Sequence, residues 1–240
     1  MENDKLKELY TDLEEIQNEV EASEQDWQLQ ERLAVYKGDD RVVSFQEFKK
    51  SIKDYNKKGL PTGLLKLDDI IEGFHRGDLI TITAPTGHGK TSFSQFLTSQ
   101  FSDTGVKSLW FSYEVPTEKL IEKFGEKLPN GFTPKVLTDR KMMWIETRIV
   151  EAIVKHKVSV VFIDHLHYLF DMTFAKNASL AIGDIMRNLK IIAKKYNIVI
   201  FIMAHTTKIG EDAIVGLDSI RDSSFIGQES DYVIALWRVK

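Results

Sequence analysis

The chain has 240 residues, a formal net charge of −4 and 42% hydrophobic residues. This composition is typical of a globular protein and excludes a disordered, collagen-like or fibrous chain. The absence of cysteine excludes a disulfide scaffold, a thiolate zinc site and a cysteine nucleophile. No apolar run reaches membrane-spanning length, and the acidic start lacks the features of a secretory signal or a mitochondrial transit peptide. We therefore expect no membrane association and a cytoplasmic location.

Residues 1–37 form the first expected region, an acidic amphipathic helix. Residues 1–31 contain eleven acidic and two basic side chains, so they carry −9 while the remainder carries +5. A narrow apolar seam predicts a helix that packs either on its own domain or on a neighbouring subunit. The seam consists of Leu6, Leu9, Leu13, Ile16, Val20 and Trp27. Residues 38–60 follow as a short helix, Ser44 to Tyr55, and a linker.

Residues 61–240 show a different pattern, in which short apolar runs alternate with amphipathic stretches of helical length. This alternation predicts an α/β domain whose mainly parallel sheet is covered by helices on both faces. The expected strands are Leu79–Ala84, Ser108–Tyr113, Val158–Ile163, Ile198–Ala204 and Tyr232–Trp237. The expected helices are Thr91–Phe101, Pro116–Lys127, Trp144–Lys155 and Ala181–Tyr196. Ligands of such sheets bind at the carboxyl ends of the strands.

A glycine-rich segment, residues 84–91, follows the first expected strand and leads into a helix. It reads Ala-Pro-Thr-Gly-His-Gly-Lys-Thr and matches the Walker A pattern, although Ala84 stands where glycine is commoner. Its glycines let backbone N–H groups point at phosphate oxygens, and the helix directs its positive dipole end at the same anion. We expect a nucleotide-binding loop made of Thr86, Gly87, His88, Gly89, Lys90 and Thr91.

The side chains of this loop and of the later strand ends predict the chemistry. Lys90 supplies a positive charge to the β- and γ-phosphates, and Thr91 offers a hydroxyl to Mg²⁺. Asp164 ends an apolar strand, where its carboxylate is placed to hold the same ion. Glu114 and His165 are both candidates for the group that activates water, and a carboxylate is the better general base.

Five blocks of the sequence together resemble the RecA-like ATPase core of hexameric replicative helicases, the DnaB family and the T7-type primase-helicases. The resemblance covers about residues 60–240. The blocks are residues 63–79, 113–116, 163–167, 204–208 and 217–231, with Ser224 standing where glycine is usual. The resemblance implies that Glu114 is the catalytic base and that His205 senses the γ-phosphate. The Asp164-His165 pair is most similar to the T7-type branch.

The resemblance also implies a function and partners. It implies a motor that hydrolyses ATP or another NTP with Mg²⁺ and moves along single-stranded DNA as a homo-oligomeric ring, a hexamer, with a primase or a loader protein as further candidate partners. The DNA-gripping loops would be residues 170–180 and 207–219, with Lys176 and Lys208 as the phosphate contacts. The family's arginine finger lies beyond the last shared strand, so we expect either a truncated chain or impaired hydrolysis.

Two other functions remain open from the sequence. One is a RecA- or KaiC-like recombination or regulatory ATPase, which would have the same site and a different output. The other is a nucleotide-binding interaction fragment with little turnover, which the missing C-terminal arginines favour. The Asp-His-Leu-His run at residues 164–167 and the Arg-Asp-Ser run at residues 221–223 favour the helicase motor.

Overall fold

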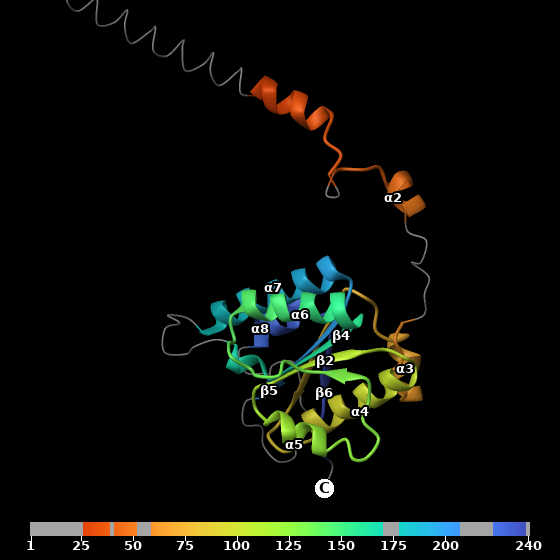
Figure 1. The fold of residues 1–240 in the computed structure, drawn as a ribbon, viewed down its shortest axis with the longest axis vertical. Helices are drawn as coiled ribbons and strands as arrows, with labels where there is room; N and C mark the ends of the chain where they lie inside the picture. Colours follow the sequence, from red (N-terminus) through yellow and green to blue (C-terminus); the bar gives the residue numbers. More distant parts are fainter. Residues whose placement is uncertain (1–25, 39–40, 52–58, 170–177, 207–222, 239–240) are drawn as a thin grey trace, which may run out of the picture. The chain divides into compact units, whose positions relative to one another are not determined.

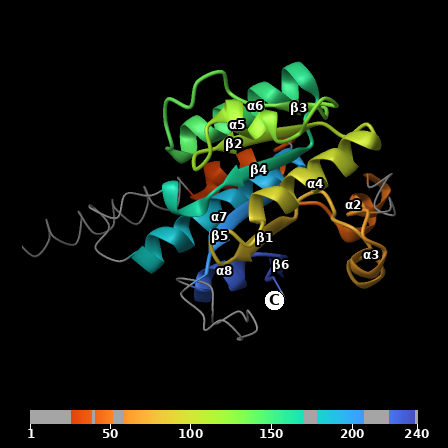
Figure 2. The same cartoon turned by 90° about the horizontal axis from the view of Figure 1, so that it is seen from below.

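The computed structural model describes residues 26–38, 41–51, 59–169, 178–206 and 223–238 (Figures 1 and 2). Contacts within the chain divide it into two units, Met1–Lys57 and Lys58–Lys240. The described part of the first unit contains a helix over residues 26–34 and helix α2, Phe45–Ser51. Most of the expected apolar seam lies outside the described residues, so the predicted boundaries after residues 37 and 60 stay predictions.

The second unit is built on one sheet of six parallel strands in the order β3-β2-β4-β5-β1-β6. The strands are β1 (Leu79–Ala84), β2 (Ser108–Ser112), β3 (Gly131–Phe132), β4 (Val160–Asp164), β5 (Val199–His205) and β6 (Tyr232–Ala235). Parallel strands need crossover connections, and helices supply them here. The sheet is the predicted α/β architecture.

Helices cover both faces of this sheet, as Figures 1 and 2 show. One face carries α6, α7 and α8, and the other carries α4 and α5. The helices are α3 (Leu65–Ile71), α4 (Lys90–Asp103), α5 (Thr117–Glu122), α6 (Met142–His156), α7 (Ala178–Tyr196) and α8 (Ser223–Glu229), and a short 3₁₀ helix, η1, spans Leu166–Tyr168. Within the described residues, no helix is long and apolar enough to cross a membrane.

The central strands are apolar on both faces because both faces are covered. Successive residues of a strand point to opposite faces, so Ile200 and Ile202 enter the core under α6 and α7. Val199, Phe201 and Met203 enter the opposite core under α4. This double burial explains why the strands read as continuous apolar runs rather than as alternating patterns.

The predicted strand and helix ends differ from the observed ones by a few residues. β4 begins at Val160 and includes Asp164, whereas the apolar run predicted a strand from Val158 to Ile163. β6 ends at Ala235 rather than Trp237. The predicted helix at Pro116–Lys127 shortens to α5. Hydrogen-bond pairing with the neighbouring strand decides where a strand ends, and hydropathy does not record it.

Three elements were missed: α3, β3 and α8. β3 has two residues and exists through its pairing with β2, so no local pattern predicts it. α8 contains Gly227, which has low helix propensity. Its Ile226 is fully buried in the core that α8 shares with α7, so packing stabilises the helix.

An aromatic cluster fills the core beneath α4. Phe201 is fully buried on β5, and its ring lies 5.0 Å from that of Phe74, 5.8 Å from that of Phe101 and 4.8 Å from that of Phe162. These rings come from segments distant in sequence, so the cluster joins the sheet to α4 and to the segment before β1.

We expect Phe201→Ala to lower the free energy of unfolding by about 3–5 kcal/mol, because it removes a fully buried ring and leaves a cavity. Urea denaturation measures the change. Ile191→Ala is the control, since this α7 side chain is 60% exposed and its removal should cost less than about 0.5 kcal/mol. A Phe201→Ala loss as small as that of the control would contradict this account of the core.

Candidate functional site

The glycine-rich loop connects β1 to α4 at the carboxyl end of the sheet. Gly87 and Gly89 adopt φ angles of 79° and 95°, in the left-handed region that glycine enters without strain. A Cβ at either position would meet nothing within 4 Å, so backbone conformation rather than crowding explains these glycines. Gly89 is the N-cap of α4 and gives no side-chain cap, so the first turn of α4 offers its N–H groups to an anion.

Lys90 is the first residue of α4, and its residue exposure is only 6%. Its Nζ donates to the Ala84 carbonyl oxygen at 2.9 Å and lies 3.1 Å from Nδ1 of His205. Burial lowers the pKa of Lys90, while the nearby Glu114 and Asp164 carboxylates oppose that shift. The ammonium group is therefore held in a poorly solvated position at the mouth of the loop, where a phosphate would be strongly attracted.

Asp164 ends β4 and is fully buried. Its Oδ2 accepts a hydrogen bond of 2.9 Å from the Thr91 hydroxyl, so the end of β4 lies against the first turn of α4. Its Oδ1 is buried without a hydrogen-bond partner in the described part of the chain. Burial raises the pKa of Asp164 to about 6, and the hydrogen bond from Thr91 partly offsets this.

Glu114 follows β2, which pairs with β4, and it lies beside Asp164. The backbone N–H groups of Tyr113 and Glu114 both donate to the Asp164 carbonyl oxygen, at 2.7 and 3.2 Å. These bonds place the Glu114 side chain over the end of β4. Its Oε2 lies 3.0 Å from His165 Nδ1 and 3.8 Å from His205 Nε2.

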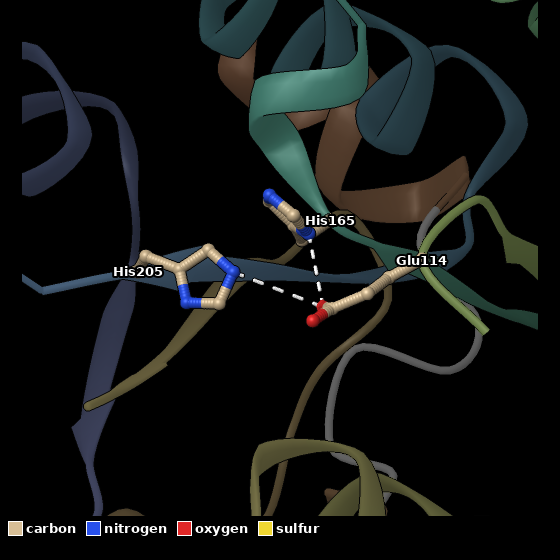
Figure 3. A group of neighbouring side chains, drawn as sticks. All are labelled: Glu114, His165 and His205. Atoms are coloured by element: carbon tan, nitrogen blue, oxygen red, sulfur yellow. Dashed lines mark hydrogen bonds and ion pairs between the residues drawn. The ribbon is translucent and has the colours of Figure 1, made fainter. Parts of the chain in front are cut away.

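Figure 3 shows that Glu114, His165 and His205 converge from the ends of three strands. Their ligand-type atoms all lie within 4.8 Å of one another. Two imidazoles and a carboxylate suit zinc and similar transition metals, whereas Mg²⁺ prefers oxygen ligands. This trio is therefore not the expected magnesium site.

The magnesium site that the sequence predicts fits Thr91 and Asp164 better. Both offer oxygen atoms, which Mg²⁺ prefers, and they are already in contact. The unpartnered Oδ1 of Asp164 is a buried polar atom of the kind that a cation would satisfy.

The structure brings most of the predicted site residues together. Lys90, Thr91, Asp164, Glu114 and His205 form one connected set of contacts. Thr86 and Gly87 are exposed on the loop. The Nδ1 of His88 accepts a 3.3 Å hydrogen bond from the Arg238 backbone N–H, a contact that the sequence did not predict.

Some predictions fall outside the described residues, and others were incomplete. Lys176 and Lys208, with nearly all of the two loops that carry them, lie outside the described part of the chain. The sequence left His165 as the weaker of two candidate bases, and it did not indicate the contact of His165 with Glu114. The position of His165 directly after a strand-ending aspartate was the available indication.

A family model described as the DnaB-like helicase C terminal domain matches residues 59–127 and 134–240. The replicative DNA helicase DnaB of Rickettsia typhi is 26% identical over 75% of this chain and 45% of that protein. The DnaB of Helicobacter pylori is 27% identical over 75% of this chain and 44% of its own length. This chain thus spans less than half of these curated relatives.

Two solved structures show the same fold. One is an isolated ATPase domain, which superimposes with a TM-score of 0.70 at 19% identity and covers 82% of this chain and 84% of its own. The other is a DnaB-like replicative helicase, described together with its interactions with primase. It has a TM-score of 0.67 at 20% identity and covers 88% of this chain and 61% of its own. The matches confirm the resemblance and the RecA-like fold expected from the motifs.

The raised pKa of Asp164 predicts a pH-dependent stability. An acid whose pKa is about 6 in the folded chain and near 3.8 in the unfolded chain stabilises the fold when protonated. That contribution is present below about pH 4 and is lost as the pH rises through 6. Without nucleotide or divalent cations, Asp164→Asn should raise the free energy of unfolding by about 1–3 kcal/mol at pH 8.

This gain should shrink as the pH falls from 6 toward 4, and urea denaturation across that range measures it. Asp69→Asn is the control, because Asp69 is an exposed carboxylate on α3 and its replacement should change stability little at any pH. A variant at position 164 that is less stable than the parent at pH 8 would contradict the assignment of burial as the dominant cause.

Proposed function

This chain belongs to the family of DnaB-like helicase C-terminal domains, and we propose that it is the nucleotide-hydrolysing motor domain of a replicative DNA helicase. One observation carries the proposal: Lys90, Thr91, Asp164 and Glu114 meet at the carboxyl edge of the sheet. A charge for phosphate, an oxygen pair for a cation and a carboxylate for water are the parts that phosphoryl transfer requires.

Nucleotide binding is the first part of this function. The N–H groups of the loop and of the first turn of α4 would surround the phosphates of ATP or another NTP. The ammonium of Lys90 would leave the Ala84 carbonyl and His205 for the β- and γ-phosphate oxygens. This exchange is favourable because a buried lysine gains a full negative charge in place of neutral acceptors.

Thr91 and Asp164 would hold the Mg²⁺ that accompanies the nucleotide. When bound, this ion neutralises charge on the β- and γ-phosphates. Asp164 must be ionised to take this part, and Lys90 already favours its ionised form.

Hydrolysis requires a group that takes a proton from the attacking water. Glu114 is the best placed carboxylate, since it lies beside Asp164 and is partly exposed to solvent. As the water oxygen bonds to the γ-phosphorus, the Glu114 carboxylate accepts its proton and the bond to the β,γ-bridging oxygen breaks, releasing ADP and phosphate.

His205 connects the two halves of the site. Its Nδ1 faces the Lys90 ammonium, which can only donate, so the other ring nitrogen, Nε2, is turned toward Glu114. We propose that arrival or loss of the γ-phosphate changes the Lys90–His205 contact, and that β5 carries this change to the loop that follows it. That loop is one of the two expected to contact DNA.

The partners are proposed from the relatives. The curated relatives are replicative DNA helicases, which supports single-stranded DNA as the polymer on which this domain moves, as part of a homo-hexameric ring. The interaction of a structural neighbour with primase supports primase as a partner of the assembled helicase. The family match favours this function over a RecA- or KaiC-like regulatory ATPase.

We expect Lys90→Ala to weaken ATP binding by at least about tenfold, because the variant loses the charge that pairs with the phosphates. Fluorescent nucleotide titration in the presence of Mg²⁺ measures the affinity. Lys119→Ala is the control, since this lysine is exposed on α5 away from the loop. Unchanged affinity in the Lys90 variant would disprove the nucleotide site.

We expect Glu114→Gln to bind ATP with nearly unchanged affinity and to hydrolyse it about 10²- to 10⁴-fold more slowly, because glutamine cannot accept the proton. Single-turnover hydrolysis with protein in excess detects slow rates, with and without single-stranded DNA. Glu118→Gln, in the first turn of α5, is the matched control. Stimulation by DNA supports the motor, whereas tight binding with no hydrolysis by the parent chain supports the nucleotide-binding interaction fragment.

A further inference from the structure

We propose that His165 is a positioning residue for Glu114: its Nδ1–H donates to Oε2 of the carboxylate and fixes the orientation in which Glu114 receives a proton from water. The inference rests on the proposed function of Glu114 as the general base. It assigns to His165 a role different from that of a competing base, and it is carried by the contact drawn in Figure 3.

The two partners differ in how firmly the fold holds them. The Glu114 side chain is 34% exposed and follows the end of β2, so the fold alone leaves it several rotamers. The His165 side chain is only 8% exposed. A hydrogen bond of 3.0 Å between a fixed ring and an adaptable carboxylate restrains the carboxylate.

The ring of His165 is held from several sides. It meets the ring of Tyr168 edge-on at 4.7 Å and the ring of His205 edge-on at 4.2 Å. The backbone N–H of Tyr168 donates to the His165 carbonyl oxygen, and the adjoining Leu166 is fully buried. These contacts fix the direction in which Nδ1 points, as a supporting group for a reactive side chain requires.

The donor and acceptor roles follow from the chemistry of the two groups. An ionised Glu114 carboxylate can only accept, so His165 Nδ1 carries the proton that the two share. Burial and the neighbouring His205 lower the pKa of His165 to about 4, so at neutral pH the ring is an uncharged donor. A neutral donor orients the base without pairing it with a charge.

The contacts of the carboxylate are divided between its two oxygens. Both contacts that the described residues make with it, from His165 and from His205, go to Oε2. The division leaves Oε1 as the oxygen for the proton of water. General-base catalysis depends on such orientation, since a misplacement of about 1 Å can cost about 10²-fold in rate.

Two substitutions separate positioning from packing. His165→Phe keeps an aromatic ring against Tyr168 and His205 but has no donor, whereas His165→Asn keeps an N–H donor near the place of Nδ1 and loses the ring. We expect His165→Phe to lower the single-turnover hydrolysis rate by about 10- to 100-fold, with ATP affinity unchanged within about twofold. His165→Asn should retain a rate within about fivefold of the parent.

The reverse pattern, an active Phe variant and an inactive Asn variant, would show that the ring acts by packing and would overturn the proposal. His75→Phe is the control, because His75 is an exposed histidine outside the site. If Glu114→Gln still hydrolyses ATP at the parent rate, the proposed function of Glu114 fails. If Glu114→Gln is inactive and His165→Phe equals the parent, only the positioning role fails.

A second readout does not depend on turnover. Long-range ¹H–¹⁵N NMR of the ¹⁵N-histidine-labelled chain in EDTA-treated buffer identifies which ring nitrogen of His165 carries the proton, with His165→Asn used to assign the signal. We expect the Nδ1–H tautomer. The Nε2–H tautomer would overturn the proposal, as would a signal showing Nδ1 bound to a retained transition metal.

Discussion

Parallel pairing in register at one edge of the sheet is the constraint on which the site depends. Ala84 at the end of β1 pairs with His205 at the end of β5, and Ser112 at the end of β2 pairs with Asp164 at the end of β4. Because all strands run in the same direction, everything that follows those four ends emerges on the same side. The glycine-rich loop, Glu114 and His165 therefore meet without any long excursion of the chain.

The apolar core makes this edge rigid. Two layers of buried side chains clamp the strands between α6 and α7 on one face and α4 on the other. Close packing of this kind resists small displacements of a strand, because a shift would open a cavity or create overlap elsewhere. The polar atoms at the strand ends inherit that rigidity, and the fold supplies the precision that the chemistry needs.

Burial of the polar groups is the other consequence of this architecture. Lys90, Asp164 and His165 are all nearly inaccessible to solvent, and desolvation is the largest cause of the shift in each of their pKa values. Perturbed titration concentrated at the mouth of a ligand-binding loop is characteristic of functional sites. Asp164 also has a buried oxygen without a hydrogen-bond partner among the described residues, and a bound cation would offset the cost of burying it.

The sequence by itself determined the chemical parts and the fold class. The order of glycines, lysine and threonine in residues 84–91 is a local pattern, and so is an aspartate at the end of an apolar run. The alternation of apolar strands and amphipathic helices is equally local, so the α/β class followed from it. The strand ends were inexact, and β3 and α8 were missed, because pairing and packing partners define those features.

Only the tertiary structure decided which parts touch. The Lys90–His205 contact joins residues 115 positions apart, and the His165–Glu114 contact joins residues 51 positions apart. Both depend on β4 lying between β2 and β5, and on β5 lying beside β1. Strand order reflects the packing of the whole sheet against its helices, and no local run of residues encodes it, so a histidine that read as a spare base became the partner of the base itself.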